Sequence, residues 1–571
     1  MKELSPERRA LLAALLSLVV VVGWQLLFAP KPPIRPPQPA PAQTTAQPAG
    51  APAAAPAAPE PPSAAAAPPI PAKAAAGEKT IVVENGLYRV VLSNHGAVVR
   101  SWQLKGYTDD HKPPRTLDLV HSEAARQTGG WPFSLALEDA QLEAQANAAL
   151  FEVAPGTTSL QAPAELQFEW SDGHLAVSKR MKFDRSYLVE IETSVTLDGT
   201  PLAHGVAWRG GFGDTTVYQP AEQVQVFFSA GGKLQILPYK KLGVPDQPSR
   251  RQRQAGTFDY VGIEDRYFAA AFLPPADKSG SLALWDWKLE RDTQQDGQPV
   301  KEPVAEMAAG SAAGPLALRV FVGPKGFDEL KKLTPPLTDL VQFGWLEFVA
   351  LPLFYLLKWL YSYVPNYGWA IILMTVLINM LLFPLKVKSW RSMQKMQKLA
   401  PEIKVIQERY KKYSLRDPRK QKMNEEVMAV YKREGVNPMG GCLPMLLQFP
   451  IWFALYRMLN VTIELRHAPW LGWIKDLSAR DPYYILPVVM AVTMYVMQKM
   501  TPTTATDPAQ QRMMNLMPLM FGGMFIVFPV SSGLVLYILS SNLVGMVQQW
   551  YLNRTAPADA KAPRGKNGKK K

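Results

Sequence analysis

Two polar residues, Thr375 and Asn379, interrupt the otherwise almost wholly apolar stretch MTVLINMLLFPLK at Met374–Lys386. Their spacing of i and i+4 places both side chains on one face of a helix. The asparagine amide offers two hydrogen-bond donors and one acceptor oxygen. Such residues either join helices, at about 0.6 kcal/mol per bond, or line a polar, partly hydrated cavity. These residues alone leave both interpretations open.

Polar residues recur in the later apolar segments. Gln448 lies between Pro444 and Pro450, and the last apolar segment carries the polar run Ser540–Asn542.

The first apolar element is near the N-terminus. Residues 10–28, ALLAALLSLVVVVGWQLLF, are nineteen uncharged residues, about 28 Å of helix against a hydrocarbon layer of about 30 Å. They predict an uncleaved membrane anchor rather than a signal peptide, because the run is long and FAPKPP after it lacks an Ala-x-Ala cleavage pattern. Lys2, Arg8 and Arg9 precede it, which favours a cytoplasmic N-terminus and export of the residues on the C-terminal side of the anchor.

A tether comes after the anchor. Residues 30–71 contain 16 prolines among 42 residues, mixed mostly with alanine. This composition cannot bury a core and favours an extended, semi-rigid chain. The single cysteine, Cys442, excludes an internal disulfide framework.

The net charge of +14 is unevenly distributed along the chain. Residues 78–338 carry 27 Lys and Arg against 32 Asp and Glu, a net charge of −5. Residues 386–438 carry +9, and the tail from 552 carries +6. The basic charge therefore lies beside apolar segments, as in cytoplasmic loops, and the tail could bind ribosomal RNA or anionic lipid or simply solubilise the end of the chain.

Residues 79–322 alternate apolar and polar residues between turns, as in LQFEWSDGHLAVSKRMKF, and this pattern predicts a β-sandwich. A short helix from Gly326 is expected to close it. No nucleophile elbow or phosphate loop is present in this region. Its histidines show no metal-ligand spacing: His95, His111, His121, His174 and His204. A β-sandwich enzyme that processes carbohydrates remains an alternative, but the sequence offers no group of catalytic residues for it.

The C-terminal half predicts one interfacial helix and five further membrane spans. Trp345–Val364 mixes aromatic residues with Glu347, Pro352 and Lys358, which suits a helix lying in the interface. The five spans are expected at 368–385, 443–459, 483–497, 513–529 and 533–548. The +9 loop is then cytoplasmic, and both termini are inside. Residues 483–497 span only about 22 Å as a helix and would thin the bilayer locally, unless their ends extend further.

Residues 386–438 predict a cytoplasmic helical hairpin. Apolar residues recur every three or four positions from Met393 and Met396 onward, and Met423 begins a similar stripe on the second helix. Asp417 and Pro418 are suited to the N-cap and first position of that second helix. Flexible methionine side chains suit contacts with varied apolar partners, although packing between the two helices accounts for part of the stripe.

Several long stretches of this half resemble the YidC membrane protein insertases. The similar stretches are VNPMGGCLPMLLQFPIWFALY at 436–456, LSARDPYYILP at 477–487, QKMTPTTATDPAQQ at 498–511 and SGLVLYILSSNLV at 532–544. The resemblance covers essentially all of 345–552. The anchor, the tether and the sandwich match the Gram-negative members in layout.

The resemblance implies a membrane insertase and chaperone that is not an enzyme and needs no cofactor or metal. It implies five core helices around a hydrophilic groove open to the cytoplasm and to lipid. Hydrophobic segments of newly made proteins would pass through the groove into the inner membrane without nucleotide hydrolysis, alone or with the Sec translocon. Ribosome, signal recognition particle receptor and membrane lipids are further implied partners.

The resemblance also implies site residues. The groove would be lined by Thr375, Asn379, Gln448, Trp452 and Tyr537, and clients would first contact Met393, Met396 and Met423 on the hairpin. The family usually places an arginine where this sequence has Asn379, so a hydrated amide would take its place here. The turn FPVSSG is longer than usual in the family, which affects the facing of Tyr537.

The sequence thus predicts a multi-domain membrane protein with an N-terminal anchor helix, an all-β periplasmic sandwich and a five-helix transmembrane core with a cytoplasmic hairpin. The expected boundaries are 1–29 for the anchor, 30–77 for the linker, 78–335 for the sandwich, 336–366 for the interfacial helix, 367–552 for the core with its hairpin at 386–438, and 553–571 for the basic tail. A channel or secondary transporter is the alternative, but it predicts paired intramembrane charges or an inverted repeat, and the sequence shows neither.

Overall fold

The structure is a computed structural model that describes residues 70–154, 158–217, 224–247, 249–276, 282–295, 298–310, 314–413, 417–436, 443–501, 508–527 and 530–555. The predicted anchor, most of the predicted linker and nearly all of the basic tail lie outside these residues. The chain forms two compact units. One contains Ala66–Tyr355 with Ile451–Ala468, and the other contains Leu356–Pro450 with Pro469–Lys571.

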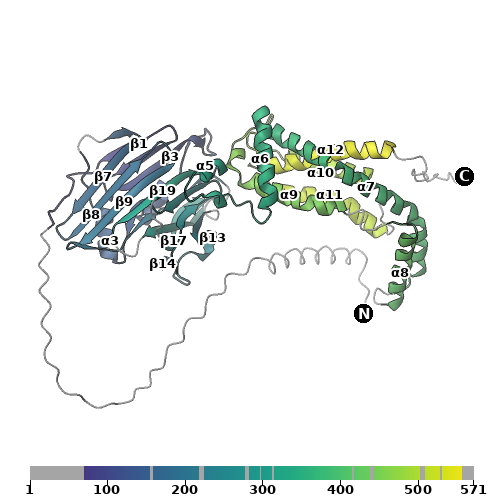
Figure 1. Ribbon diagram of the computed structural model, residues 1–571, viewed down its shortest axis with the longest axis horizontal. Coiled ribbons are helices and arrows are strands. Elements are labelled where there is room, and N and C mark those ends of the chain that lie inside the picture. Colours follow the sequence, from purple (N-terminus) through teal and green to yellow (C-terminus); the bar gives the residue numbers. More distant parts are fainter. Residues whose placement is uncertain are drawn as a thin grey trace, which may run out of the picture. The chain divides into compact units, whose positions relative to one another are not determined.

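The first unit is built on three β-sheets, seen in Figure 1. One five-stranded sheet has the order β4-β3-β2-β1-β6, in which only β1 and β6 pair in parallel. Its strands are β1 (Thr80–Glu84), β2 (Tyr88–Ser93), β3 (Val98–Thr108), β4 (Thr116–Asp118) and β6 (Ser159–Gln161).

The largest sheet has nine strands in the order β13-β12-β15-β16-β19-β9-β8-β7, with β10 paired to β9. Its strands are β7 (Ala164–Ser171), β8 (Leu175–Phe183), β9 (Leu188–Leu197), β10 (Thr200–Pro201), β12 (Gln225–Ala230), β13 (Lys233–Pro238), β15 (Tyr260–Glu264), β16 (Phe268–Leu273) and β19 (Leu316–Pro324).

The third sheet has the order β14-β17-β18-β11-β5. Its strands are β5 (Ser134–Ala136), β11 (Gly205–Trp208), β14 (Gln252–Arg253), β17 (Ala283–Gln295) and β18 (Gln298–Gly310). This unit also contains short helices: α2 (Ser122–Thr128), α3 (Ala140–Ala148), η1 (Tyr239–Lys241), α5 (Phe327–Lys331), η2 (Thr338–Leu340) and η4 (Ile463–Leu465).

The predicted alternation explains how the sheets share one core. On β8, residues 175, 177, 179, 181 and 183 are buried, and the residues between them are more exposed. Because side chains alternate across a strand, one face of β8 points into the core. The predicted turn also forms, since Asp172 Oδ1 accepts from the backbone N–H groups of His174 and Leu175 between β7 and β8. Residues of all three sheets belong to one buried cluster, including Trp102, Phe272 and Met307, so the predicted β-sandwich is confirmed.

The end of the predicted linker already pairs with this unit. Lys73 N–H donates to Ser171 O at 2.8 Å, and Ser171 N–H returns a bond to Lys73 O at 2.9 Å. The predicted closing helix is α5, whose Phe327 packs on Phe343 and Phe354.

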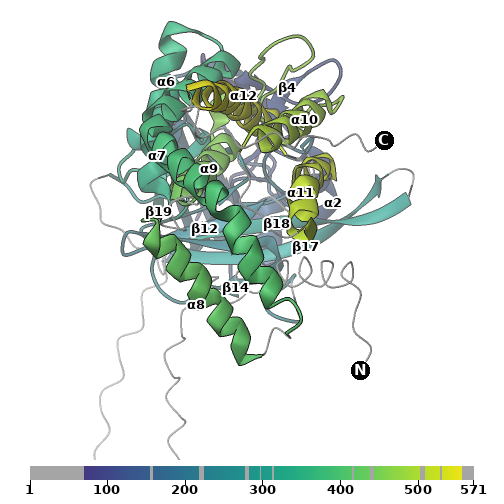
Figure 2. The same ribbon diagram turned by 90° about the vertical axis from the view of Figure 1, so that its right-hand side faces the viewer.

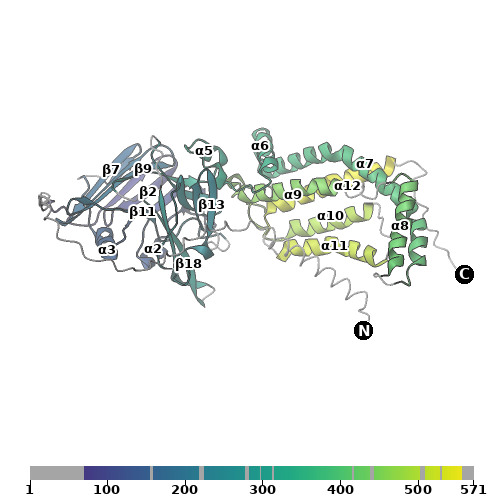
Figure 3. The same ribbon diagram turned by 60° about the horizontal axis from the view of Figure 1, so that its bottom comes forward.

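The second unit consists of helices. Figure 3 shows α7, α12, α10 and α11 as neighbours, with α12 packed against both α7 and α10. The helices are α6 (Glu347–Tyr363), α7 (Tyr367–Arg409), α8 (Pro418–Arg433), α9 (Leu443–Val461), α10 (Ile485–Met500), α11 (Pro508–Val527) and α12 (Ser532–Thr555). The division between the two units falls inside α6 and α9.

Small residues allow these helices to approach closely. A Cβ built on Gly522 of α11 would lie 2.4 Å from the Ala491 Cβ of α10. A Cβ on Gly545 of α12 would lie 2.8 Å from the Met497 Cε of α10. Glycine at these positions therefore permits tight helix packing, as is common between membrane helices.

The predicted first core span and first hairpin helix form one continuous helix. Helix α7 has 43 residues and contains Pro384 and Pro401. Asn366 caps its N-terminus by accepting from Trp369 N–H at 3.2 Å. Among the described residues, α7 alone is long and apolar enough to cross a membrane, and α10 is a shorter apolar helix. The remaining predicted spans stay predictions.

Candidate functional site

Helix α7 carries the two polar residues that the sequence singled out. Thr375 is fully buried, and its hydroxyl donates to Ile371 O at 2.7 Å. Asn379 is 2% exposed, and its Nδ2 donates to Thr375 O at 2.8 Å. Both side chains are thus on the buried side of α7 and bond to their own helix, which satisfies donors that would be costly to bury alone.

Asn379 also joins α7 to α12. Its Nδ2 donates to Ser541 Oγ at 3.3 Å, and its backbone oxygen accepts from Gln548 Nε2 at 3.0 Å. Lys386 Nζ donates to Asn379 Oδ1 at 2.7 Å and to Gln548 Oε1 at 3.1 Å. We call Asn379, Lys386, Ser541 and Gln548 the α7–α12 polar cluster.

Helix geometry explains why these four residues meet. Asn379 and Lys386 are seven residues apart on α7, and Ser541 and Gln548 are seven apart on α12. Seven residues are close to two full turns, so each pair lies on one stripe of its helix. The contact between α7 and α12 brings the two stripes together. Sequence reasoning identified Asn379 and Ser541, but it did not select Lys386 or Gln548.

Tyr537 continues the same stripe of α12, because it precedes Ser541 by four residues. It is buried and hydrogen-bonds with the half-buried Gln448 of α9. The structure therefore pairs Thr375 with Asn379 and Gln448 with Tyr537. Trp452 lies in the first unit, half-buried, with its ring edge-on to Phe453 at a centroid distance of 5.2 Å.

The outer faces of the helices in this unit are apolar. On α7, Leu381 is 81% exposed and Met380 is 64% exposed. The other helices have similar residues with large exposed areas: Val488, Val492, Leu516, Leu519, Met520, Leu543 and Val547. Exposed apolar surface on several neighbouring helices, combined with polar contacts between them, is typical of helices in lipid.

The predicted hairpin is formed by the end of α7 and by α8, side by side in Figure 2. Asp417 caps α8 by accepting from Arg419 N–H, with Pro418 in the first turn, as the sequence predicted. The two helices run antiparallel, because Glu402 pairs with Arg433 at 2.9 Å and Tyr410 bonds Glu426 at 2.7 Å.

The three predicted client-contact methionines differ in exposure. Met396 is buried, and Met393 and Met423 are half-buried. Packing within the unit therefore uses part of the stripe. Sequence reasoning did not select Met428, which is 53% exposed and lines a cleft of about 450 Å³ on α8 with Tyr431 and Val436.

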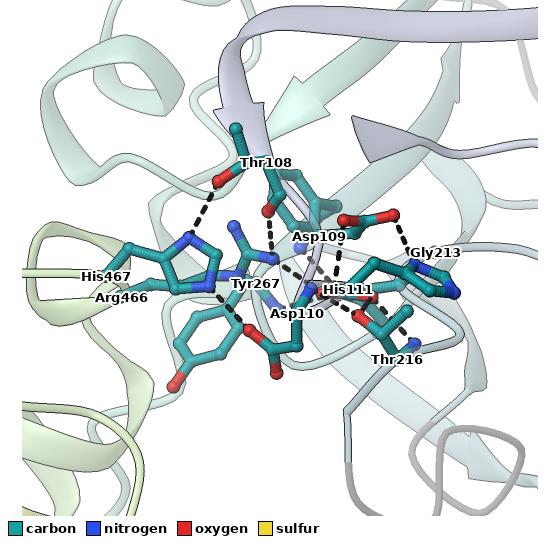
Figure 4. A network of polar contacts seen from close by, with 12 residues as sticks. Thr108, Asp109, Asp110, His111, Gly213, Thr216, Tyr267, Arg466 and His467 are labelled. Carbon is teal, nitrogen blue, oxygen red and sulfur yellow. Dashed lines mark hydrogen bonds and ion pairs between the residues drawn. The ribbon is translucent and has the colours of Figure 1, made fainter. Parts of the chain in front are cut away.

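A second polar network lies within the first unit, between the β-sandwich and residues 451–468, and is drawn in Figure 4. Arg466 Nη2 donates to Asp214 Oδ2 at 2.5 Å and to Thr108 O at 2.7 Å. His467 Nε2 lies 2.7 Å from Asp110 Oδ1, and its hydrogen bond holds the pKa of Asp110 below the ordinary value. Sequence patterns carry no signal for this network, because its partners are hundreds of residues apart.

The chain combines a β-sandwich with a unit of closely packed helices. The outer faces of these helices are apolar, and a polar cluster lies between α7 and α12. These features define a multi-domain membrane protein. Family comparisons agree with this class. Residues 80–356 match the family described as YidC periplasmic domain, and residues 359–559 match the family described as 60Kd inner membrane protein.

Relatives extend over most of the chain. A membrane protein insertase YidC of Methylobacillus flagellatus is 32% identical over 492 residues, which cover 85% of this chain and 86% of the relative. That of Cupriavidus taiwanensis is 35% identical over 489 residues, covering 84% and 82%. A crystal structure of an active YidC insertase aligns over 85% of this chain and 95% of that chain, with 18% identity and a TM-score of 0.34. The chain belongs to the YidC membrane protein insertase family.

Proposed function

We propose that this protein moves hydrophobic segments of newly made proteins from the cytoplasm into the inner membrane. The relatives that match most of its length are named membrane protein insertases, and their family names refer to an inner membrane protein and a periplasmic domain. The protein performs no covalent reaction in this proposal. Its work is to lower the barrier that a polar flank meets on entering lipid.

The α7–α12 polar cluster is the observation that carries the proposal. A polar group moved into hydrocarbon without partners loses its hydrogen bonds to water, which costs several kcal/mol. Amide and hydroxyl groups between two helices can replace part of that hydration. Thr375, Asn379, Gln448, Trp452 and Tyr537 are the proposed groove residues, and Asn379 is the one with bonds to both α7 and α12.

The driving force in this proposal is transfer of the client's apolar surface out of water, at about 25 cal/mol per Å². The membrane potential assists movement of charged flanks. The sequence contains no Walker-type phosphate loop, which agrees with insertion independent of nucleotide.

Clients would first contact the hairpin on the cytoplasmic side. Met393 and Met423 are partly accessible, and Met428 adds an exposed methionine beside the cleft on α8. Flexible methionine side chains adapt to apolar segments of different shape. We propose the Sec translocon, the ribosome, the signal recognition particle receptor and membrane lipids as partners in the same process.

Asn379→Leu is the first test of the proposal. The variant removes the amide bonds to Ser541 and Lys386 with little change in side-chain volume. We expect insertion of a short single-span client to slow by about fivefold, the effect of losing about one hydrogen bond. Protease protection of the client in proteoliposomes that contain only this protein, without nucleotide, measures the rate.

Empty liposomes and Asn379→Gln, which keeps the amide, are the controls. Equal melting temperatures in detergent would show that the leucine variant is folded. Insertion by a folded leucine variant at the wild-type rate would remove Asn379 from the groove. Protection no greater than in empty liposomes for the wild type would contradict insertion by this protein alone.

A further inference from the structure

A cavity of about 420 Å³ lies in the β-sandwich, within the first unit. Its walls come mainly from the start of β3, from the segment between α2 and β5, and from α3. Small-molecule sites in proteins usually have volumes of about 300–1,000 Å³. The proposed insertion of client segments makes no use of this cavity, so its side chains need another explanation.

The wall formed by α3 is fixed in place and lined with small residues. Asn147 of α3 donates to Leu135 O at 2.8 Å and accepts from Leu135 N–H at 2.8 Å, which ties α3 to β5. Ala140, Ala144 and Ala148 recur every four positions, so they line the cavity from one face of the helix. Their methyl groups leave the space open and make this wall apolar.

Three polar side chains of the cavity have groups without hydrogen-bond partners. Ser134 is 3% exposed, and its hydroxyl has no partner among the residues that the structure describes. His95 is half-buried, and its ring nitrogens form no hydrogen bond within the described ranges. The half-buried Arg100 lies 3.6 Å from Glu78 and donates no hydrogen bond to any described residue. Buried polar groups are normally hydrogen-bonded, so three such groups around one cavity point to a ligand that supplies acceptors.

The guanidinium group of Arg100 is held in position for such a ligand. Its Cζ lies 4.2 Å from the centre of the Trp131 ring, which also lines the cavity. Stacking on an aromatic ring orients the planar group, so less freedom is lost when it binds a partner. Burial lowers the pKa of Arg100 because the charged form loses hydration, yet arginine stays charged near neutral pH. An anion would replace part of the lost hydration.

The other charged groups of the cavity wall are already neutralised by each other. Arg209 Nε lies 3.1 Å from Glu306, and its Nη1 lies 3.5 Å from Glu143. Glu143 also pairs with Arg251. A ligand with one negative charge can therefore pair with Arg100, whereas Glu143 in the same wall would repel a doubly charged phosphate more strongly.

We propose that this cavity binds a small organic carboxylate with an apolar body. The carboxylate oxygens accept from the Arg100 guanidinium, whose planar fork matches a carboxylate with two parallel bonds. His95 and Ser134 are the further donors, and the apolar body lies against Trp131 and the alanine face of α3. This binding site is independent of the proposed insertase function and adds a ligand-binding role to the β-sandwich.

Phenylacetate is the probe for this site, and phenylacetamide, which has nearly the same shape and no charge, is its matched control. Ligand-observed NMR titrations of the full-length protein in detergent measure both affinities, with detergent alone as the blank. We expect phenylacetate to bind with a Kd of about 1 mM and about tenfold more tightly than phenylacetamide, because only the carboxylate forms charge-assisted bonds. Arg100→Gln should abolish this preference. Arg180→Gln, on the exposed face of β8, should keep it.

Two further variants separate binding from folding. Ser134→Ala should weaken phenylacetate binding by about fivefold, while the melting temperature without ligand stays equal or rises, because the hydroxyl has no partner to lose. Ala144→Leu should abolish binding by filling the cavity, and it should leave the protein folded because Ala144 is exposed on a helix.

The proposal is overturned if phenylacetate shows no saturable binding or binds no better than phenylacetamide. Equal affinity in the wild type, Arg100→Gln and Ala144→Leu would place the probe elsewhere and would also overturn it. Binding of inorganic phosphate more tightly than phenylacetate would overturn the carboxylate assignment in favour of a phosphate site. None of these results depends on client insertion, so they leave the proposed function to its own test.

Discussion

For Asn379, the sequence predicted the helix face on which the side chain lies, but it did not predict all of its hydrogen-bond partners. The spacing from Thr375 predicted a shared face, and the structure places both side chains there. The resemblance implies an arginine at this position, and the chain has a neutral amide. The amide oxygen accepts from Lys386, a residue two turns further along. Whether the Lys386 side chain extends back over two turns to Asn379 depends on its conformation, so sequence spacing alone did not reveal this contact.

A second residue of this kind is Lys179 on β8. It lies at an inward position of the alternating pattern, where its neighbours Val177 and Met181 are apolar and buried. Its ammonium group donates to three backbone carbonyls, those of Gly96, Ala97 and Phe133. Burial lowers the pKa of Lys179 from 10.5 to about 7, because the charged form loses its hydration.

The lowered pKa predicts a pH dependence of stability. Between pH 7 and pH 10.5 the unfolded chain holds a proton at Lys179 that the folded β-sandwich tends to release. The free energy of unfolding therefore rises with pH across this window, and below pH 7 the burial of the charged form destabilises the fold most. We expect Lys179→Met to lose this rise between about pH 7 and pH 10.5.

Denaturant midpoints of the β-sandwich transition, monitored by tryptophan fluorescence in the full-length protein, measure the effect. Lys182→Met is the control, because Lys182 is on the same strand with a side chain that is 41% exposed. The same pH dependence in the wild type and in both variants would contradict the assignment to Lys179.

At the scale of elements, periodic burial determined what the sequence could predict. Strands such as β8 were predictable because one face is buried and side chains alternate. The N-cap of α8 was predictable because Asp417 and Pro418 act within one turn. The network of Arg466 was not, since Asp214 is 252 residues away in the sequence and no local pattern records the pairing.

The Arg466–Asp214 pair provides a prediction at this scale. Both side chains are buried, at 3% and 1% exposed, and together they hold residues 451–468 to the β-sandwich. Arg466→Met leaves the Asp214 carboxylate buried without its cation, which we expect to destabilise this unit by roughly 3–5 kcal/mol. Denaturant unfolding of the purified protein in detergent measures the loss.

A surface ion pair of the same sandwich is the matched control. Arg180 lies 2.8 Å from Glu165, with side chains 43% and 48% exposed. We expect Arg180→Met to cost less than about 1 kcal/mol, because water screens an exposed pair. Equal costs for the two variants would show that the Arg466 pair contributes no more than a surface pair.

At the scale of the whole molecule, the net charge differs in sign between segments of the chain. The β-sandwich region 78–338 has a net charge of −5, whereas 386–438 has +9. Basic residues next to membrane helices remain in the cytoplasm. The proposed arrangement therefore has the sandwich in the periplasm, and the hairpin and the C-terminus in the cytoplasm. Because Cys442 is the single cysteine of the chain, Cys442→Ser gives a background in which one introduced thiol reports one location.

Three introduced cysteines test this orientation in that background. Lys301 of the sandwich has a side chain that is 71% exposed, and Lys411 after α7 and Arg554 in α12 are also exposed. We expect a membrane-impermeant maleimide to label Lys301→Cys in cells with a permeabilised outer membrane, because the proposed arrangement has the sandwich in the periplasm. Lys411→Cys and Arg554→Cys should be labelled only after the inner membrane is disrupted. Labelling of Lys411→Cys in intact inner membranes would place the basic hairpin in the periplasm. This result would contradict both the positive-inside rule and the proposed reception of clients from the cytoplasm.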